Sequence, residues 1–237
     1  MNRRKGDQVK IIIAVAALLM WVHTASAQKE YSVSVSRHQD VPELSEAEVN
    51  AILDAASTML QTNPGAACNV KFTLRSPVRT FGSPDTHIPP IVDKYHKDAV
   101  HGIDSDLAGV DIHVKVVEGI KDVCRFASDR GFRGCSWPHD FRSLIVVHPN
   151  RHRDFSTNKL MSEVFPDKKF PDHLLWAHEF GHLTGLVEHR SDADDPDKDA
   201  LMHARDVFDY VFHPRSVKVN DRECNCFRSG LLSCERQ

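Results

Sequence analysis

Apolar residues recur every three or four positions between residues 49 and 60, which is the spacing of one face of an α-helix. Ser45 and Glu48 come just before them in the S-x-x-E pattern of a capping box. Asn63-Pro64-Gly65 then interrupts the pattern with residues that end helices. The sequence therefore predicts an amphipathic helix from residue 45 to about residue 63.

Three later segments have the pattern of β-strands. Apolar and polar residues alternate over 69–81 and 110–120, and 144–148 is a continuous apolar run bounded by polar residues and a proline. Residues 82–109 carry several Pro, Gly and Asp, which predicts a loop with one short helical piece. Residues 28–44 are polar and lack apolar periodicity, so we expect an N-terminal arm or a short pro-segment. A helix followed by strands is compatible with an α/β fold.

The first 27 residues have the pattern of a secretory signal peptide. Basic residues at positions 3–5 precede an apolar run at 11–22, and Ala25-Ser26-Ala27 is a typical cleavage site. The apolar run is shorter than the roughly 20 residues needed to cross a bilayer. We therefore expect a secreted or periplasmic protein that keeps no stable membrane anchor after cleavage before Gln28.

Charge and cysteine content narrow the partners and the compartment. The whole chain has a formal net charge of −3, and loss of the signal peptide with its four basic residues and one acidic residue makes this −6. An acidic mature chain argues against a nucleic-acid partner. All six cysteines follow the cleavage site, and an even number in a secreted chain indicates disulfide bonds.

The cysteine spacing restricts the pairing. The disulfide candidates are Cys68, Cys124, Cys135, Cys224, Cys226 and Cys234. Cys124 and Cys135 flank a short stretch and are expected to pair locally. A bond between Cys224 and Cys226 would be strained, so we expect one of the three C-terminal cysteines to pair with Cys68. The alternative is a zinc knuckle at Cys224-x-Cys226, which lacks a second ligand pair at the right spacing.

The segment His178-Glu179-Phe180-Gly181-His182 has the spacing of a metal site on a helix. Residues four apart share a helix face, so the two imidazoles can bind one zinc ion. Glu179 would lie beside the metal, where a carboxylate can act as a general base. Gly185 would let the chain leave the helix. The third ligand would then be His189 or Glu188.

Two other groups of polar residues are weaker metal candidates. His87, His96 and His101 lie in one loop and could form a second site, although scattered loop histidines are more often solvated. The acidic segment 191–199 could bind Ca²⁺, but it lacks the spacing of an EF-hand. A solvated charged turn is the favoured interpretation of that segment.

The H-E-x-x-H-x-x-G sequence, with Leu201-Met202 some 20 residues after it, resembles the metzincin clan of zinc metalloendopeptidases. The match covers residues 176–205. The resemblance implies one α/β (α+β) catalytic domain over 45–237. In that domain a twisted, mostly parallel sheet packs on helices, with an active-site helix, a Met-turn and a C-terminal helix, for which 206–212 is the candidate. It also implies a zinc site with these parts: His178 and His182 as ligands, Glu179 as base, Gly185 as the turn and Met202 beneath the metal.

The third ligand departs from the clan pattern by one residue. The pattern places it three residues after Gly185, at Glu188, whereas the histidine comes one later, at His189. We favour His189, because a loop outside the helix can absorb one residue and a neutral imidazole matches the other two ligands. Glu188 is the alternative, since carboxylates bind zinc in other hydrolases.

The resemblance implies a secreted endopeptidase that hydrolyses protein or peptide substrates through a zinc-activated water, with Glu179 as general base. The strand at 144–147 is expected to offer its edge to an extended substrate. One alternative is a zincin of another subclass, in which Asp206 or Glu223 supplies the third ligand. The other is a secreted zinc-binding protein without catalytic activity.

Overall fold

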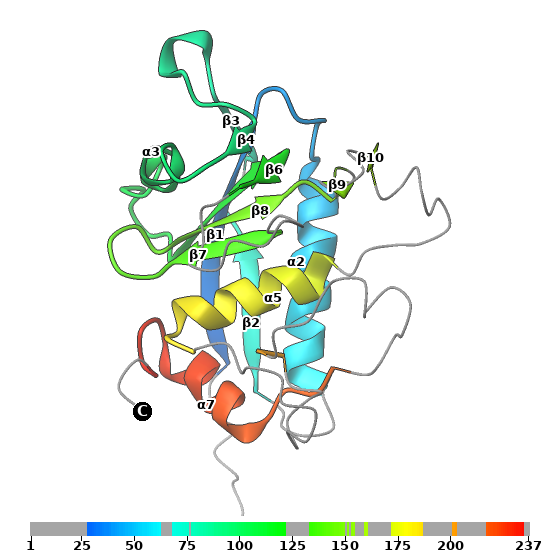
Figure 1. The fold of residues 1–237 in the computed structure, drawn as a ribbon. Helices are drawn as coiled ribbons and strands as arrows, with labels where there is room; N and C mark the ends of the chain where they lie inside the picture. Colours follow the sequence, from blue (N-terminus) through cyan, green and yellow to red (C-terminus); the bar gives the residue numbers. More distant parts are fainter. Residues whose placement is uncertain are drawn as a thin grey trace, which may run out of the picture.

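A computed structural model describes residues 28–62, 68–75, 77–121, 133–149, 151, 153–154, 159–160, 172–186, 201–202 and 217–234. Its centre is a six-stranded sheet of order β2-β1-β5-β8-β7, in which β3 also pairs with β1 (Figure 1). The strands are β1 (Lys29–His38), β2 (Val70–Leu74), β3 (Arg79–Phe81), β5 (Ile112–Val117), β7 (Gly134–Trp137) and β8 (Ser143–Val147). Every pairing is parallel except that of β7 with β8. The predicted mostly parallel α/β sheet is confirmed.

Residues 28–44 were predicted to be an N-terminal arm or a short pro-segment, but most of them form strand β1. It pairs in parallel with β2, β3 and β5, so it lies in the interior of the sheet. Tyr31, Val33 and Val35 are buried in the main core, and the serines between them are buried on the other face. Ser34 Oγ, for example, lies 2.8 Å from Nδ1 of His113. The prediction of an arm or removable pro-segment is wrong for this stretch, because removing it would take out an interior strand.

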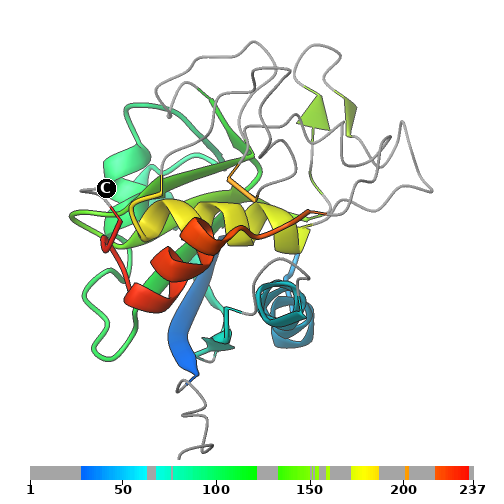
Figure 2. The ribbon, with the colours of Figure 1, turned by 90° about the horizontal axis from the view of Figure 1, so that it is seen from below.

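Three helices cover one face of the sheet: α2 (Glu46–Thr62), α5 (Asp172–Leu183) and α7 (Asp221–Ser229) (Figures 1 and 2). The predicted capping box of α2 is confirmed, since Ser45 N donates to Glu48 over 2.9 Å and Glu48 N donates to Ser45 Oγ over 3.2 Å. The helices and the sheet enclose the larger core, where the rings of Phe72 and Phe180 lie 4.4 Å apart. This core fixes α5, which carries the H-E-x-x-H segment, against the sheet.

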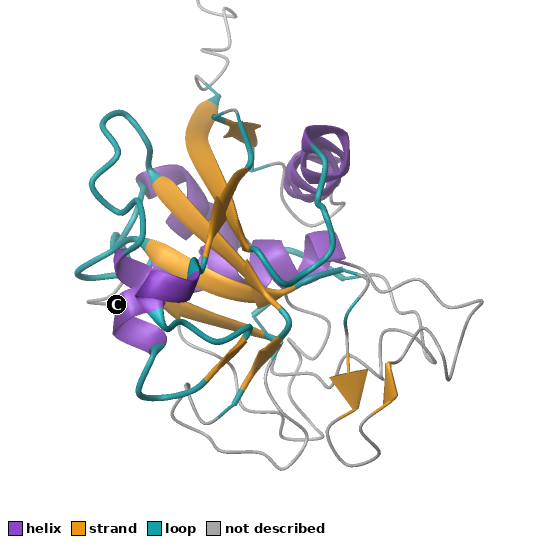
Figure 3. Ribbon diagram, turned by 90° about the horizontal axis from the view of Figure 1, so that it is seen from above, coloured by secondary structure: helices purple, strands orange, loops and turns teal. Residues whose placement is uncertain are grey.

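The opposite face carries a smaller core. Helix α3 (Lys97–Gly102) and strands β4 (Ile91–Val92) and β6 (Gly119–Ile120) contribute buried residues to it, and the 3-10 turn η1 (Pro84–Thr86) lies between β3 and β4 in the chain. Helix α3 confirms the short helical piece predicted within 82–109. Figure 3 shows the twisted strands from above, with α2 seen end on beside them. A separate antiparallel pair consists of β9 (Arg153–Asp154) and β10 (Lys159–Leu160).

Two predicted strands are divided, and the outermost strand differs from the expected one. Residues 69–81 form β2 and β3, and residues 110–120 form β5 and β6. The strand predicted at 144–148 is β8, but it pairs with β5 on one edge and with β7 on the other. The expectation that this strand offers a free edge to a substrate is therefore wrong, and β7 takes the end position of the sheet.

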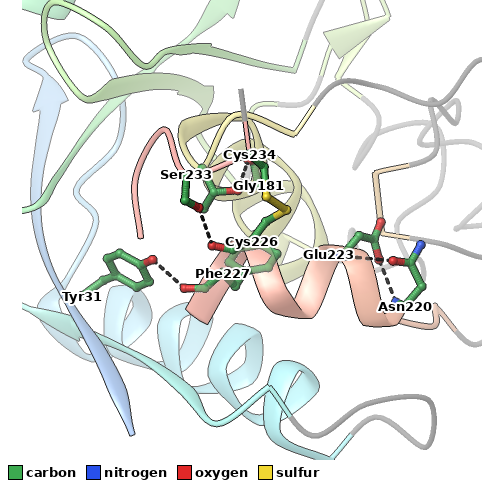
Figure 4. Close-up of a disulfide and its surroundings, with 9 residues drawn as sticks. Tyr31, Gly181, Asn220, Glu223, Cys226, Phe227, Ser233 and Cys234 are labelled. Carbon is green, nitrogen blue, oxygen red and sulfur yellow. Dashed lines mark hydrogen bonds between the residues drawn. A yellow bond between two sulfur atoms is a disulfide. The ribbon is translucent and has the colours of Figure 1, made fainter. Parts of the chain in front are cut away.

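Two disulfides attach helix α7 to the rest of the fold. Cys68–Cys224 joins it to the residues after α2, and Cys226–Cys234 joins it to the C-terminal turn (Figure 4). The expected bond from Cys68 to a C-terminal cysteine is confirmed, and the zinc knuckle is excluded because both of its cysteines are oxidised. Cys135 is also disulfide-bonded. Its predicted partner, Cys124, lies outside the described residues.

Helix α7 was not predicted from the cysteine-rich tail. Its N-cap, Asn220, accepts a hydrogen bond from Glu223 N over 2.8 Å, and Asn220 N donates to the Glu223 carboxylate over 3.0 Å (Figure 4). The N-x-x-E spacing of this capping box is the sequence signal that could have located the helix. The helix expected at 206–212 and the signal peptide lie outside the described residues. Within the described ranges, no helix is long and apolar enough to cross a membrane.

Candidate metal centre

Helix α5 brings His178 and His182 together on one face. The helix begins at Asp172, and its apolar side is buried in the main core. The two imidazole rings lie 4.8 Å apart between centroids, with their planes at 88°. Positions i and i+4 lie one above the other on a helix, so a single turn is enough to create this pair.

Each of these imidazoles is oriented by a backbone carbonyl. Nδ1 of His178 lies 2.9 Å from the carbonyl oxygen of Leu201, and Nδ1 of His182 lies 2.9 Å from that of Leu186. A carbonyl oxygen only accepts hydrogen bonds, so Nδ1 carries the proton in each ring and Nε2 carries the lone pair. Metal-binding histidines usually donate their second ring nitrogen in this way. Both side chains therefore have the tautomer that suits a metal ligand.

The turn after α5 contributes to this orientation. Gly185 has a φ of +93°, where a side chain would be strained, and its N–H donates to the carbonyl oxygen of His182 over 3.0 Å. Leu186 N donates to the carbonyl oxygen of Gly181 over 3.3 Å. The chain thus reverses at Gly185, as the sequence predicts. The same reversal brings the Leu186 carbonyl to the ring of His182.

Glu179 projects from α5 towards the end strand β7. It is only 5% exposed, and Ser136 Oγ donates to its Oε2 over 2.5 Å. The same hydroxyl lies 2.9 Å from the backbone carbonyl oxygen of Glu179. A Cβ atom at Gly134 would overlap the carboxylate. Sequence reasoning did not identify Ser136 or Gly134, because only the packing of β7 on α5 brings them to the motif.

Met202 packs against the centre of the motif. It is fully buried, and a Cβ atom at Gly181 would overlap its sulfur. Its backbone N–H donates to Oε1 of Glu223 over 2.7 Å. The preceding residue, Leu201, supplies the carbonyl that orients His178. The segment Leu201–Met202 is therefore held between α5 and α7.

Glu223, which was suggested as a zinc ligand, instead binds backbone N–H groups in the interior of the protein. Its side chain is fully buried and accepts backbone hydrogen bonds from Met202 and from Asn220. His178, His182 and Glu223 are all described, and they do not form a group that could hold a metal ion, so the structure contradicts Glu223 as the third ligand. The other candidate in that hypothesis, Asp206, lies outside the described residues.

The third metal ligand remains a prediction. His189, Glu188 and the acidic segment 191–199 all lie outside the described residues. Among the residues that are described, no group of three or more His, Cys, Asp or Glu side chains could hold a metal ion. The described part of the candidate centre is therefore the histidine pair and Glu179.

Among the described residues, His87, His96 and His101 do not form a group that could hold a metal ion. His96 Nδ1 lies 2.8 Å from a carboxylate oxygen of Asp93 near the surface. His101 is fully buried, with its ring 5.3 Å from that of Trp137 and 6.4 Å from that of Phe141. Burial lowers the pKa of His101 to about 3, so this imidazole is neutral.

The solved structures that align with most of the chain include metalloproteinase-II from Bacteroides fragilis and mirolysin. No protein-family model and no curated protein sequence matches the chain. Metalloproteinase-II from Bacteroides fragilis aligns over 90% of this chain and 55% of its own, with 13% identity and a TM-score of 0.45. Mirolysin, in complex with compound 9, aligns over 85% and 91%, with 11% identity and a TM-score of 0.45. The chain thus spans about half the length of the first structure. At this TM-score the likeness has no bearing on activity.

Proposed function

We propose that this protein is a secreted, zinc-dependent endopeptidase. The observation that carries the proposal is the pair of imidazoles on α5, each held by a backbone carbonyl at Nδ1 so that Nε2 carries a lone pair. A buried carboxylate, Glu179, stands directly beside them in the sequence. A purely structural metal site would have no need of that carboxylate.

The donor set fits zinc. Neutral imidazole nitrogen is a preferred zinc ligand, and the carbonyls of Leu201 and Leu186 fix the tautomers that ligation requires. His178 and His182 would hold the ion, with His189 as the proposed third ligand and Glu188 as its alternative. Zinc in such a site supplies Lewis acidity, which makes a water molecule more acidic and polarises a carbonyl group.

Proton transfer and substrate binding are assigned to residues of the chain. Glu179 accepts a proton from the attacking water and returns it to the leaving amine. Strand β7 is the end strand of the sheet and lies against α5, so an extended peptide pairing with its outer edge would pass beside Glu179.

The disulfides of α7 fit export to an oxidising compartment, which agrees with the signal peptide proposed at 1–27.

Metal content and protein hydrolysis, measured on the same variants, test this function. We expect the mature chain to bind about one zinc ion and to hydrolyse casein, and a chelator to abolish the hydrolysis. Glu179→Ala should keep the zinc and lower kcat by about 10²- to 10⁴-fold. His178→Ala should lose the zinc. A zinc-loaded wild type without hydrolysis on casein or a peptide library would overturn the proposal in favour of a non-catalytic zinc protein.

The third ligand is tested by zinc affinity. His189→Ala should weaken zinc binding by orders of magnitude, whereas Glu188→Ala should leave it nearly unchanged. The reverse order would assign the ligand to Glu188.

A further inference from the structure

Strand β7 presents two small residues to helix α5. The side chain of Cys135 belongs to the core on the α3 face of the sheet. Successive residues of a strand point to opposite faces, so Gly134 and Ser136 face the helix. Both of them meet the same residue, Glu179. The two consecutive inward positions of strand β7 therefore both lie against Glu179, the proposed base.

The contacts at these two positions are complementary. Ser136 Oγ binds Oε2 of Glu179 over 2.5 Å, within the range of hydroxyl–carboxylate hydrogen bonds, and also lies 2.9 Å from the Glu179 carbonyl oxygen. Gly134 leaves the space that the other carboxylate oxygen, Oε1, occupies, since a Cβ there would overlap it. One residue thus supplies a bond to the carboxylate and the other supplies room for it.

A glutamate side chain is flexible, and its reach to a reacting water depends on which rotamer it adopts. A hydrogen bond that holds one oxygen against β7 leaves the second oxygen with a defined direction. Misplacement of a catalytic group by about 1 Å can lower a rate by about 10²-fold. We propose that Ser136, with the clearance at Gly134, is the positioning residue for Glu179, an inference that rests on the proposed endopeptidase function.

A double-mutant cycle in the metal-free protein tests the contact without any activity. Urea unfolding is measured for wild type, Ser136→Ala, Glu179→Ala and the double variant. Ser136→Ala should raise the unfolding equilibrium constant by about tenfold more in the wild-type background than in the Glu179→Ala background. Equal effects in both backgrounds would overturn the proposal, because the hydroxyl would then not be coupled to the carboxylate.

Kinetics of the zinc-loaded protein test the positioning role. Ser136→Ala should lower kcat by about 10- to 100-fold and leave KM and zinc content unchanged. Ser136→Thr keeps the hydroxyl and should restore most of kcat, whereas Gly134→Ala should lower kcat by displacing the carboxylate.

Ser143→Ala is the matched control for these variants. Ser143 is a buried serine on β8 opposite Trp137, and its hydroxyl has no hydrogen-bond partner among the described residues. The kcat of the Ser143→Ala variant should equal that of wild type. A normal kcat in Ser136→Ala, or an equal loss in Ser136→Thr, would overturn the positioning role alone. A wild type that hydrolyses nothing would overturn the endopeptidase function and the role together, whatever coupling the cycle shows.

Discussion

Loss of the Cys68–Cys224 disulfide should destabilise the fold far more than loss of the Cys226–Cys234 disulfide. Both bonds end on α7, but their sequence separations are 156 and 8 residues. A cross-link removes entropy from the unfolded chain, and the effect grows with the logarithm of the loop length. This relation gives about 5 kcal/mol for the long loop and about 2.5 kcal/mol for the short one at 25 °C.

The two double variants, Cys68→Ala/Cys224→Ala and Cys226→Ala/Cys234→Ala, form a matched pair. All four cysteines are buried, so each variant removes two buried sulfur atoms and the packing losses are similar. Equilibrium unfolding in urea, followed by circular dichroism and extrapolated to water, gives the two free energies of unfolding. The long-loop variant should be less stable than the short-loop variant by about 2.5 kcal/mol. Equal losses, or a larger loss in the short-loop variant, would refute loop length as the origin of the stabilisation.

Three further changes probe the core, the acid stability and strand β1. Glu223→Gln replaces one of two buried acceptor oxygens by a donor facing a backbone N–H of Met202 or Asn220. It should lower the free energy of unfolding in urea by about 1–3 kcal/mol, and wild-type stability would contradict the role of these bonds. Burial holds the pKa of His101 at about 3, below its ordinary 6.5, so the unfolded chain binds a proton that the folded protein excludes, and stability is lost as the pH falls below 6.5. Between pH 7 and pH 5, wild type should therefore lose about 2 kcal/mol more than His101→Phe, whereas parallel pH profiles would count against the buried neutral imidazole. Deletion of residues 28–38 should abolish the cooperative thermal transition seen by circular dichroism, and a truncated protein that still melts cooperatively would show β1 to be dispensable.

Local patterns predicted the elements in which one face is uniformly apolar. The capping box at Ser45 and the apolar face after it located α2, and the apolar run at 144–148 located β8. Strand β1 was not predicted, because every second residue from Ser32 to Ser36 is a serine, and serine is classed as polar. In the structure these serines are buried through hydrogen bonds to side chains such as Asp111 and Asp104 from distant parts of the chain. Composition alone does not reveal such partners.

The sequence by itself determined that His178 and His182 share a helix face, because the helical period requires it. It also indicated the reversal at Gly185, since few other residues adopt a positive φ. Only the tertiary structure decided that the Leu201 carbonyl orients His178, which backbone groups bind the carboxylate of Glu223 and where the carboxylate of Glu179 lies. These contacts join β7, α5, Leu201–Met202 and α7, which are far apart in the chain. Packing of the sheet and the disulfides brings them together, and no local spacing encodes that packing.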